Sequence, residues 1–94
     1  MDRKQFVEQM KAKIDEWNAE IDRLEAKMRQ ESAEKRAEYE ERMQELRAER
    51  DRAAAELRRQ REEGEQDWED RRAEAQRAWE DVKEGFRRAW DRLS

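Results

Sequence analysis

The sequence contains no cysteine, histidine, threonine or proline, and only two of its 94 residues are glycine. Without cysteine the chain has no disulfide or thiol chemistry. The hydroxyl side chains are limited to Ser32, Tyr39 and Ser94. Nucleophilic catalysis needs an activated nucleophile with a base in reach, and these residues cannot supply such a pair. We therefore expect a protein that is not an enzyme and that carries no cofactor.

Long hydrophobic runs are also missing. No stretch approaches the roughly 20 apolar residues that span a bilayer, and the N-terminal MDRKQFVEQM lacks an apolar run of signal-peptide length. A cytoplasmic location is the expectation. The net charge is −4, whereas a nucleic-acid partner would require a basic face. We expect no nucleic-acid partner.

The charged residues do not form a recognisable metal site. Acidic clusters occur at Glu40/Glu41, Glu62/Glu63 and Asp67/Glu69/Asp70, and each has arginine close by. No glycine-centred calcium loop or histidine-containing ligand set accompanies them. We interpret these clusters as a solvated charged surface and expect no bound metal.

What the sequence does contain is a helix-forming composition. Charged residues make up 53% of the chain, apolar residues 34%, and 23 basic residues nearly balance 27 acidic ones. Alanine, glutamate, arginine, lysine, glutamine and leucine dominate, as in long helices and coiled coils. A globule of this length needs more apolar surface than this composition supplies. We therefore predict an all-α, long-helix coiled coil that forms a single helical domain over residues 1–94.

The N-terminal third carries a regular apolar seam. Its large apolar residues follow one another at alternating steps of three and four, which is the a/d pattern of a coiled coil. They are Val7, Met10, Ile14, Trp17, Ile21, Leu24 and Met28. Asp2, followed by Gln5, fits the capping box that opens such a helix.

The C-terminal third, WEDRRAEAQRAWEDVKEGFRRAW, has a different periodicity. Trp68, Trp79 and Trp90 recur in it every eleven residues. Eleven residues make three turns at about 3.67 residues per turn, so each indole returns to nearly the same face of a straight helix. The units DWEDRRAEAQR and AWEDVKEGFRR indicate an internal repeat.

The segment RRQREEGEQDWED, residues 58–70, predicts an interruption. Gly64 can follow the end of one helix, and Asp67 can cap the next. This gives helix one over about residues 2–62 and helix two over about 68–93. The alternative is one continuous long helix that tolerates Gly64 at a cost of about 1 kcal/mol. Gly85, inside the second periodic segment, instead predicts a close approach between helices.

Folding back at Gly64 would give an asymmetric two-helix hairpin, with Trp68 near Leu57, Trp79 near Leu46 and Trp90 near Tyr39. The residues expected to pack in the hairpin or against a partner are Tyr39, Met43, Leu46, Leu57, Trp68, Trp79, Val82, Phe86, Trp90 and Leu93. The excess length of helix one leaves the seam from Val7 to Met28 without a partner in its own chain. We therefore predict a homodimer or higher assembly through that seam and an unstable monomer.

A lipid surface is the alternative partner. Eleven-residue repeats with tryptophan also suit an amphipathic helix lying on a membrane. Such helices usually show a broad apolar face and an excess of basic residues. Here the stripe is narrow, and residues 65–94 carry seven basic against nine acidic residues. The pattern favours packing between helices over binding to lipid.

The motifs IDEWNAEIDRLEAK and AWEDVKEGFRRAWDRL resemble a family of small bacterial coiled-coil proteins, known from cyanobacteria and proteobacteria as stress-response proteins. Trp17, Ala19, Glu20, Ile21, Asp22 and Leu24 match the first motif, and Ala78–Trp79 with Ala89–Trp90 match the second. The resemblance implies a non-enzymatic, self-associating helical protein linked to stress. Besides a second copy of the chain, another protein is a candidate partner. It assigns no catalytic or ligand-binding residue.

Overall fold

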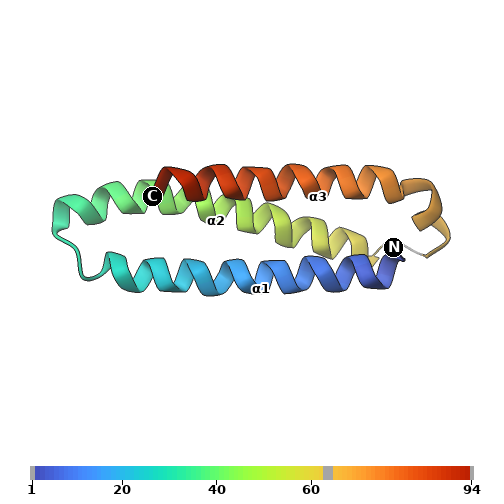
Figure 1. Cartoon of the computed structure of the whole chain (residues 1–94), viewed down its shortest axis with the longest axis horizontal. Helices are drawn as coiled ribbons and strands as arrows, with labels where there is room; N and C mark the ends of the chain where they lie inside the picture. The colour runs from blue at the N-terminus through green and yellow to red at the C-terminus, as the bar shows by residue number, and fades with distance from the viewer. Residues whose placement is uncertain (1, 63–64, 94) are drawn as a thin grey trace.

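The computed structural model of this chain describes residues 2–62 and 65–93. These residues form three helices, α1 (Arg3–Met28), α2 (Ala33–Glu62) and α3 (Glu65–Leu93), with no strand among them. The all-α prediction is confirmed. The helices lie side by side in an elongated bundle measuring 53 × 17 × 17 Å (Figure 1).

The start of α1 follows the sequence prediction. Gln5 N donates a hydrogen bond to Asp2 Oδ1 over 2.8 Å, and Asp2 N donates to Gln5 Oε1 over 3.3 Å. Two backbone N–H groups at the open end of the helix are thereby satisfied by each other's side chains. The predicted capping box is confirmed.

The helix predicted for residues 2–62 is interrupted, because the chain leaves the helix between Met28 and Ala33. The two-helix hairpin and the single continuous helix are therefore both wrong. No glycine or proline marks the linker Arg29–Ser32; its one local signal for a break is Ser32, which can cap the start of a helix but does not force a helix to begin there. The reason is tertiary: the turn lets α1 bury its apolar seam against α2 and α3 of the same chain, and such burial outweighs helix propensity.

The second predicted break falls on Gly64, which lies outside the described residues. The helices that flank it are antiparallel (Figure 1). Arg92 of α3 pairs with Glu45 of α2, and Gly85 packs against the Glu49 side chain. A Cβ placed on Gly85 would lie 2.5 Å from Glu49 Oε2, so this glycine leaves room for the end of the Glu49 side chain; the three nearest atoms all belong to that side chain and none to the α2 backbone.

The predicted register between these two helices is wrong. Ala78 and Val82 line one groove together with Ala55 and Glu56. Trp79 is therefore level with residues 55–56 and not with Leu46. The prediction assumed a tight reversal at Gly64, whereas the first turns of α3 extend past the end of α2 before the helices pair (Figure 1).

α1 completes the bundle. It runs antiparallel to α2, since Arg50 contacts Asn18 while Arg3 contacts the backbone of Gln60, and it runs parallel to α3. One continuous core joins the three helices. It consists of Phe6, Met10, Ile14, Trp17, Ile21, Met43, Leu46, Ala53, Leu57, Trp68, Ala75, Trp79, Val82, Phe86 and Ala89.

Candidate interaction surface

Aromatic side chains make the contact between α1 and α3. The Phe6 and Trp68 ring centroids are 5.3 Å apart, and those of Trp17 and Trp79 are 5.5 Å apart. Trp17 also stacks on Phe86, with centroids 4.2 Å apart and planes inclined by 9°. The eleven-residue step from Phe6 to Trp17 thus matches the step from Trp68 to Trp79 on the parallel helix. These large rings hold the two backbones apart.

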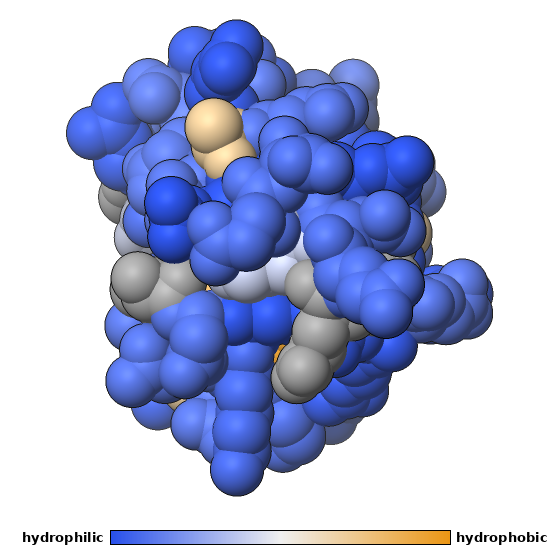
Figure 2. All heavy atoms as spheres, turned by 90° about the vertical axis from the view of Figure 1, so that its right-hand side faces the viewer, coloured by the Kyte–Doolittle hydropathy of each residue, from blue (hydrophilic) through white to orange (hydrophobic). Residues whose placement is uncertain are grey.

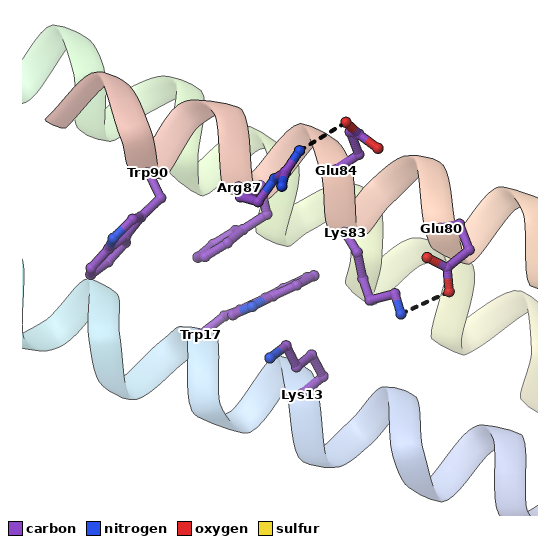
Figure 3. Close-up of a pocket in the computed structure, with 8 residues that line it drawn as sticks. Lys13, Trp17, Glu80, Lys83, Glu84, Arg87 and Trp90 are labelled. Atoms are coloured by element: carbon purple, nitrogen blue, oxygen red, sulfur yellow. Dashed lines mark hydrogen bonds and ion pairs between the residues drawn. The ribbon is translucent and has the colours of Figure 1, made fainter. Parts of the chain in front are cut away.

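A groove follows the line along which α1 and α3 are separated. It comprises two adjoining cavities of about 440 and 390 Å³, which share Glu80 and Lys83 in their walls. Trp17, Phe86 and Trp90 line the larger cavity (Figure 3). We call this the aromatic groove. Its volume is in the range of small-molecule pockets, but it is open along its length, as a groove for an extended partner would be.

The rim of the aromatic groove carries charges of both signs. Lys83 Nζ lies 2.8 Å from Glu80 Oε1, and Arg87 Nη2 lies 3.1 Å from Glu84 Oε1 (Figure 3). Lys13 extends over the groove from α1. Because these side chains are substantially exposed, their pairing contributes little to stability. Their alternation of sign instead makes the rim able to pair with a second surface of the same kind.

Trp90 differs from the other two tryptophans of α3, because it is half-buried whereas Trp68 and Trp79 are buried. The core residues of α3 from Ala75 to Ala89 follow alternating steps of four and three, a shorter period than eleven-thirds. At 3.6 residues per turn, a residue twenty-two positions after Trp68 points about 40° past the direction of Trp68, whereas a core spaced in steps of four and three drifts about 20° per heptad in the opposite sense. The eleven-residue spacing therefore turns Trp90 out of the core and onto the edge of the groove.

Further half-buried apolar side chains accompany Trp90. Leu24, Met28 and Leu93 pack against the core without being enclosed by it. The offset that pairs Phe6 with Trp68 and Trp17 with Trp79 also makes Met28 level with Trp90. All four belong to the end of the bundle where α1 turns into α2 and α3 stops short of that turn (Figure 1). We call Leu24, Met28, Trp90 and Leu93 the apolar edge.

Polar contacts fix α1 against α2. Arg47 Nη2 lies 3.2 Å from Glu25 Oε1 on α1, and Arg47 Nη1 lies 2.7 Å from Glu40 Oε1. The hydrogen bond to Glu40, with a smaller contribution from Glu25, raises the pKa of the Arg47 guanidinium above its usual value against the opposing effect of burial. Arg50 Nη1 donates to Asn18 Oδ1 over 3.0 Å. These contacts set how far along α2 the first helix lies.

The opposite end of the bundle is closed by polar groups. Arg3 donates to the backbone oxygens of Gln60 and Arg61 over 2.8 Å each, which satisfies carbonyls at the open end of α2. Gln60 is itself buried, and its Nε2 donates to Glu56 Oε1 over 2.9 Å. Gln60 Oε1 and the buried Trp68 Nε1 have no hydrogen-bond partner among the described residues. Figure 2 shows that hydrophilic residues cover most of the visible surface at this end.

The residues predicted for an interface between chains lie mainly inside one chain. Met10, Ile14, Trp17 and Ile21 are at most 6% exposed, and they face α2 and α3 of their own chain. Val7, Leu24 and Met28 are half-buried at the border of the core. The argument that the seam lacks an internal partner is therefore wrong, and with it the reason for expecting an unstable monomer.

The residues predicted to pack in the hairpin are nearly all in the core. Met43, Leu46, Leu57, Trp68, Trp79, Val82 and Phe86 are buried; Trp90 and Leu93 are half-buried against the core. Tyr39 is half-buried near the start of α2, away from Trp90. The sequence identified the right side chains, but their partners include α1.

Among the larger buried side chains, Phe6 and Gln60 were not identified from the sequence. Phe6 is 3% exposed, and it could have been found because it precedes Trp17 by the same eleven residues that separate the later tryptophans. Gln60 is 2% exposed; its polar side chain gives no sign of burial, and the signal that was available is its position. Gln60 continues the spacing of Leu46 and Ala53 by one further heptad.

Within residues 2–62 and 65–93, no group of three or more acidic, cysteine or histidine side chains is placed to hold a metal ion. None of the helices in these ranges is both long and apolar enough to cross a membrane. Comparisons with models of known protein families, with curated proteins and with solved structures found no match to this chain.

Proposed function

We propose that this chain is a non-enzymatic structural and interaction protein that self-assembles through its apolar helix stripes, within the cytoplasm. The observation that carries the proposal is the apolar edge. Leu24, Met28, Trp90 and Leu93 continue the core of the bundle to the surface, where the chain itself covers them only in part. A second copy of the chain that covers them would remove this apolar surface from water.

The surroundings of the edge suit a second copy. The adjacent aromatic groove offers Lys83 and Arg87 beside Glu80 and Glu84, so a two-fold related surface would meet charges of opposite sign. A surface that contacts its own copy must be self-complementary in this way. A strongly basic or acidic rim would instead have favoured a partner of opposite charge.

Sedimentation over a wide range of protein concentration tests the proposal. We expect the wild-type mass to rise from 11.6 kDa to at least twice that value. Trp90→Ser should weaken association about tenfold, because a half-buried indole contributes roughly 1.4 kcal/mol to it. Arg87→Ser, on the exposed rim of the same groove, removes one rim charge and should weaken association less than Trp90→Ser, because an exposed charge pair contributes at most about 1 kcal/mol. A wild-type mass that stays monomeric at every concentration would overturn the proposal.

A lipid surface is the second candidate partner. α3 has the sharpest separation of apolar and polar faces of the three helices. If α3 left the bundle, Trp68, Trp79 and Phe86 could enter the headgroup region of a membrane. This function predicts a blue shift of tryptophan emission and co-flotation with anionic vesicles; unchanged emission without co-flotation would exclude it. The link to stress rests on the two sequence motifs and is tested by measuring expression under stress.

A further inference from the structure

The linker between α1 and α2 contains no residue that forces a turn. Arg29 keeps helical backbone angles, φ −64° and ψ −20°, and no described residue has a positive φ. Gln30 N donates to Lys27 O and Glu31 N to Met28 O, both over 3.1 Å. The chain therefore leaves α1 through one tightened turn of nearly helical backbone.

The side chains of the linker suit a continuous helix equally well. Arginine, glutamine and glutamate are good helix formers. Glu31 and Lys35 already lie at the i, i+4 spacing, with Lys35 Nζ 3.9 Å from Glu31 Oε2. The feature that opposes a continuous helix is Ser32, whose Oγ accepts a hydrogen bond from Lys35 N over 3.4 Å at the start of α2. The local conformational preferences of these residues therefore give the turn and a continuous helix nearly equal free energies.

What closes the turn is the contact of α1 with α2 and α3. Trp17 lies against Trp79 and Phe86 of α3, while Asn18 and Glu25 bond to Arg50 and Arg47 of α2. None of these contacts requires that α1 and α2 belong to the same copy of the chain. An α1 from a second copy would make each of them in the same way.

We propose that two copies of this chain exchange α1. In each copy the linker straightens, so that residues 3–62 form one helix about 90 Å long. The α1 part of each helix then occupies the seam between α2 and α3 of the other copy. Because α1 is antiparallel to α2, the two long helices are antiparallel and related by a two-fold axis at the linkers.

This inference rests on the proposed function, since both require the chain to associate with itself, and it specifies the contact. The exchanged dimer keeps the core of each bundle and adds helical hydrogen bonds across the linker. It also places the apolar edge of one copy toward that of the other, because the edge lies beside the turn that becomes the centre of the dimer (Figure 1). α1 must leave its seam before it can exchange, so the monomer and dimer interconvert on the timescale of unfolding.

Two substitutions at the linker should shift the equilibrium in opposite directions. Ala33→Pro fits the first position of α2, where the N–H has no acceptor within the helix, but it disrupts a helix that runs through this position. We expect it to lower the dimer association constant at least 100-fold while helicity of the monomer is unchanged. Ser32→Ala removes the cap from the closed form of each chain and should raise the association constant about 25-fold.

Cross-linking identifies which copy supplies α1. The chain has no cysteine, so Asn18→Cys with Arg50→Cys places two thiols across the α1–α2 contact and nowhere else. The protein is refolded from urea at high concentration, its dimer is isolated by gel filtration, and a short bis-maleimide is added. In a denaturing gel, exchange gives a covalent dimer of twice 11.6 kDa, whereas association without exchange gives cross-linked monomers.

The outcomes separate the two proposals. A covalent dimer, together with its loss in the Ala33→Pro background, supports exchange. If the native dimer contains only intrachain cross-links and Ala33→Pro does not change its association constant, exchange is overturned. Self-assembly is then still supported. A protein that is monomeric after refolding at every concentration, including the Ser32→Ala variant, overturns both.

Discussion

Replacing Trp17 by alanine tests the aromatic packing between α1 and α3. This indole is 4% exposed, and it contacts the rings of both Trp79 and Phe86 on α3. A buried tryptophan removes about 150–250 Å² from water, which at about 25 cal/mol per Å² corresponds to roughly 4–6 kcal/mol. Measured losses for such truncations are about 3–5 kcal/mol. We expect Trp17→Ala to lower the free energy of unfolding by about 4 kcal/mol.

Trp90→Ala is the matched control, because it removes the same side chain from the same groove. Trp90 is half-buried and its ring centroid lies 6.5 Å from that of Phe86, so little packing is lost. We expect a loss of about 2 kcal/mol or less, since roughly half of the area returns to water. A domain of this size is stable by about 5–14 kcal/mol in total, so the two variants should differ visibly.

Urea unfolding followed by far-ultraviolet circular dichroism measures both variants without relying on the fluorophore that they remove. The measurement is made at two protein concentrations, so that dissociation of an assembly is separated from unfolding of the bundle. The reasoning is refuted if the two variants lose equal stability, or if Trp17→Ala loses less than about 1 kcal/mol. Either result would mean that Trp17 is not enclosed between α1 and α3.

Two further substitutions probe the core and the α2–α3 contact. Ile21→Asp places a carboxylate at a side chain only 1% exposed, and it should abolish cooperative thermal unfolding measured by circular dichroism; a wild-type melt would show that the seam is open to water. Gly85→Ala gains about 1 kcal/mol of helix propensity but displaces the Glu49 carboxylate, so its net effect on unfolding in urea should be small. When Glu49→Ala is added, Gly85→Ala should raise the free energy of unfolding by the full gain in helix propensity. A double-mutant cycle that shows no coupling between these two positions would contradict the contact between Gly85 and the Glu49 side chain.

The sequence was sufficient for most features that depend on residues near one another along the chain. The composition predicted helices, and Asp2 with Gln5 predicted the cap that opens α1. Apolar spacing identified most of the core side chains, since periodicity shows which residues share a face of a helix. Gly85 indicated a contact on that face of α3, because a helix interior otherwise disfavours glycine, and the end of the Glu49 side chain makes that contact.

The tertiary structure alone decided where the first turn lies and which helices meet. Arg29, Gln30 and Glu31 have the same helix-forming character as their neighbours, and Ser32 can cap a helix without forcing one to begin, so local preference alone could not place a break there. The register that places Ala78 and Val82 beside Ala55 and Glu56 depends on how side chains interdigitate across the pair and on how far α3 extends past α2. An apolar stripe specifies which face must be covered but not which helix covers it, because burial from water is non-directional.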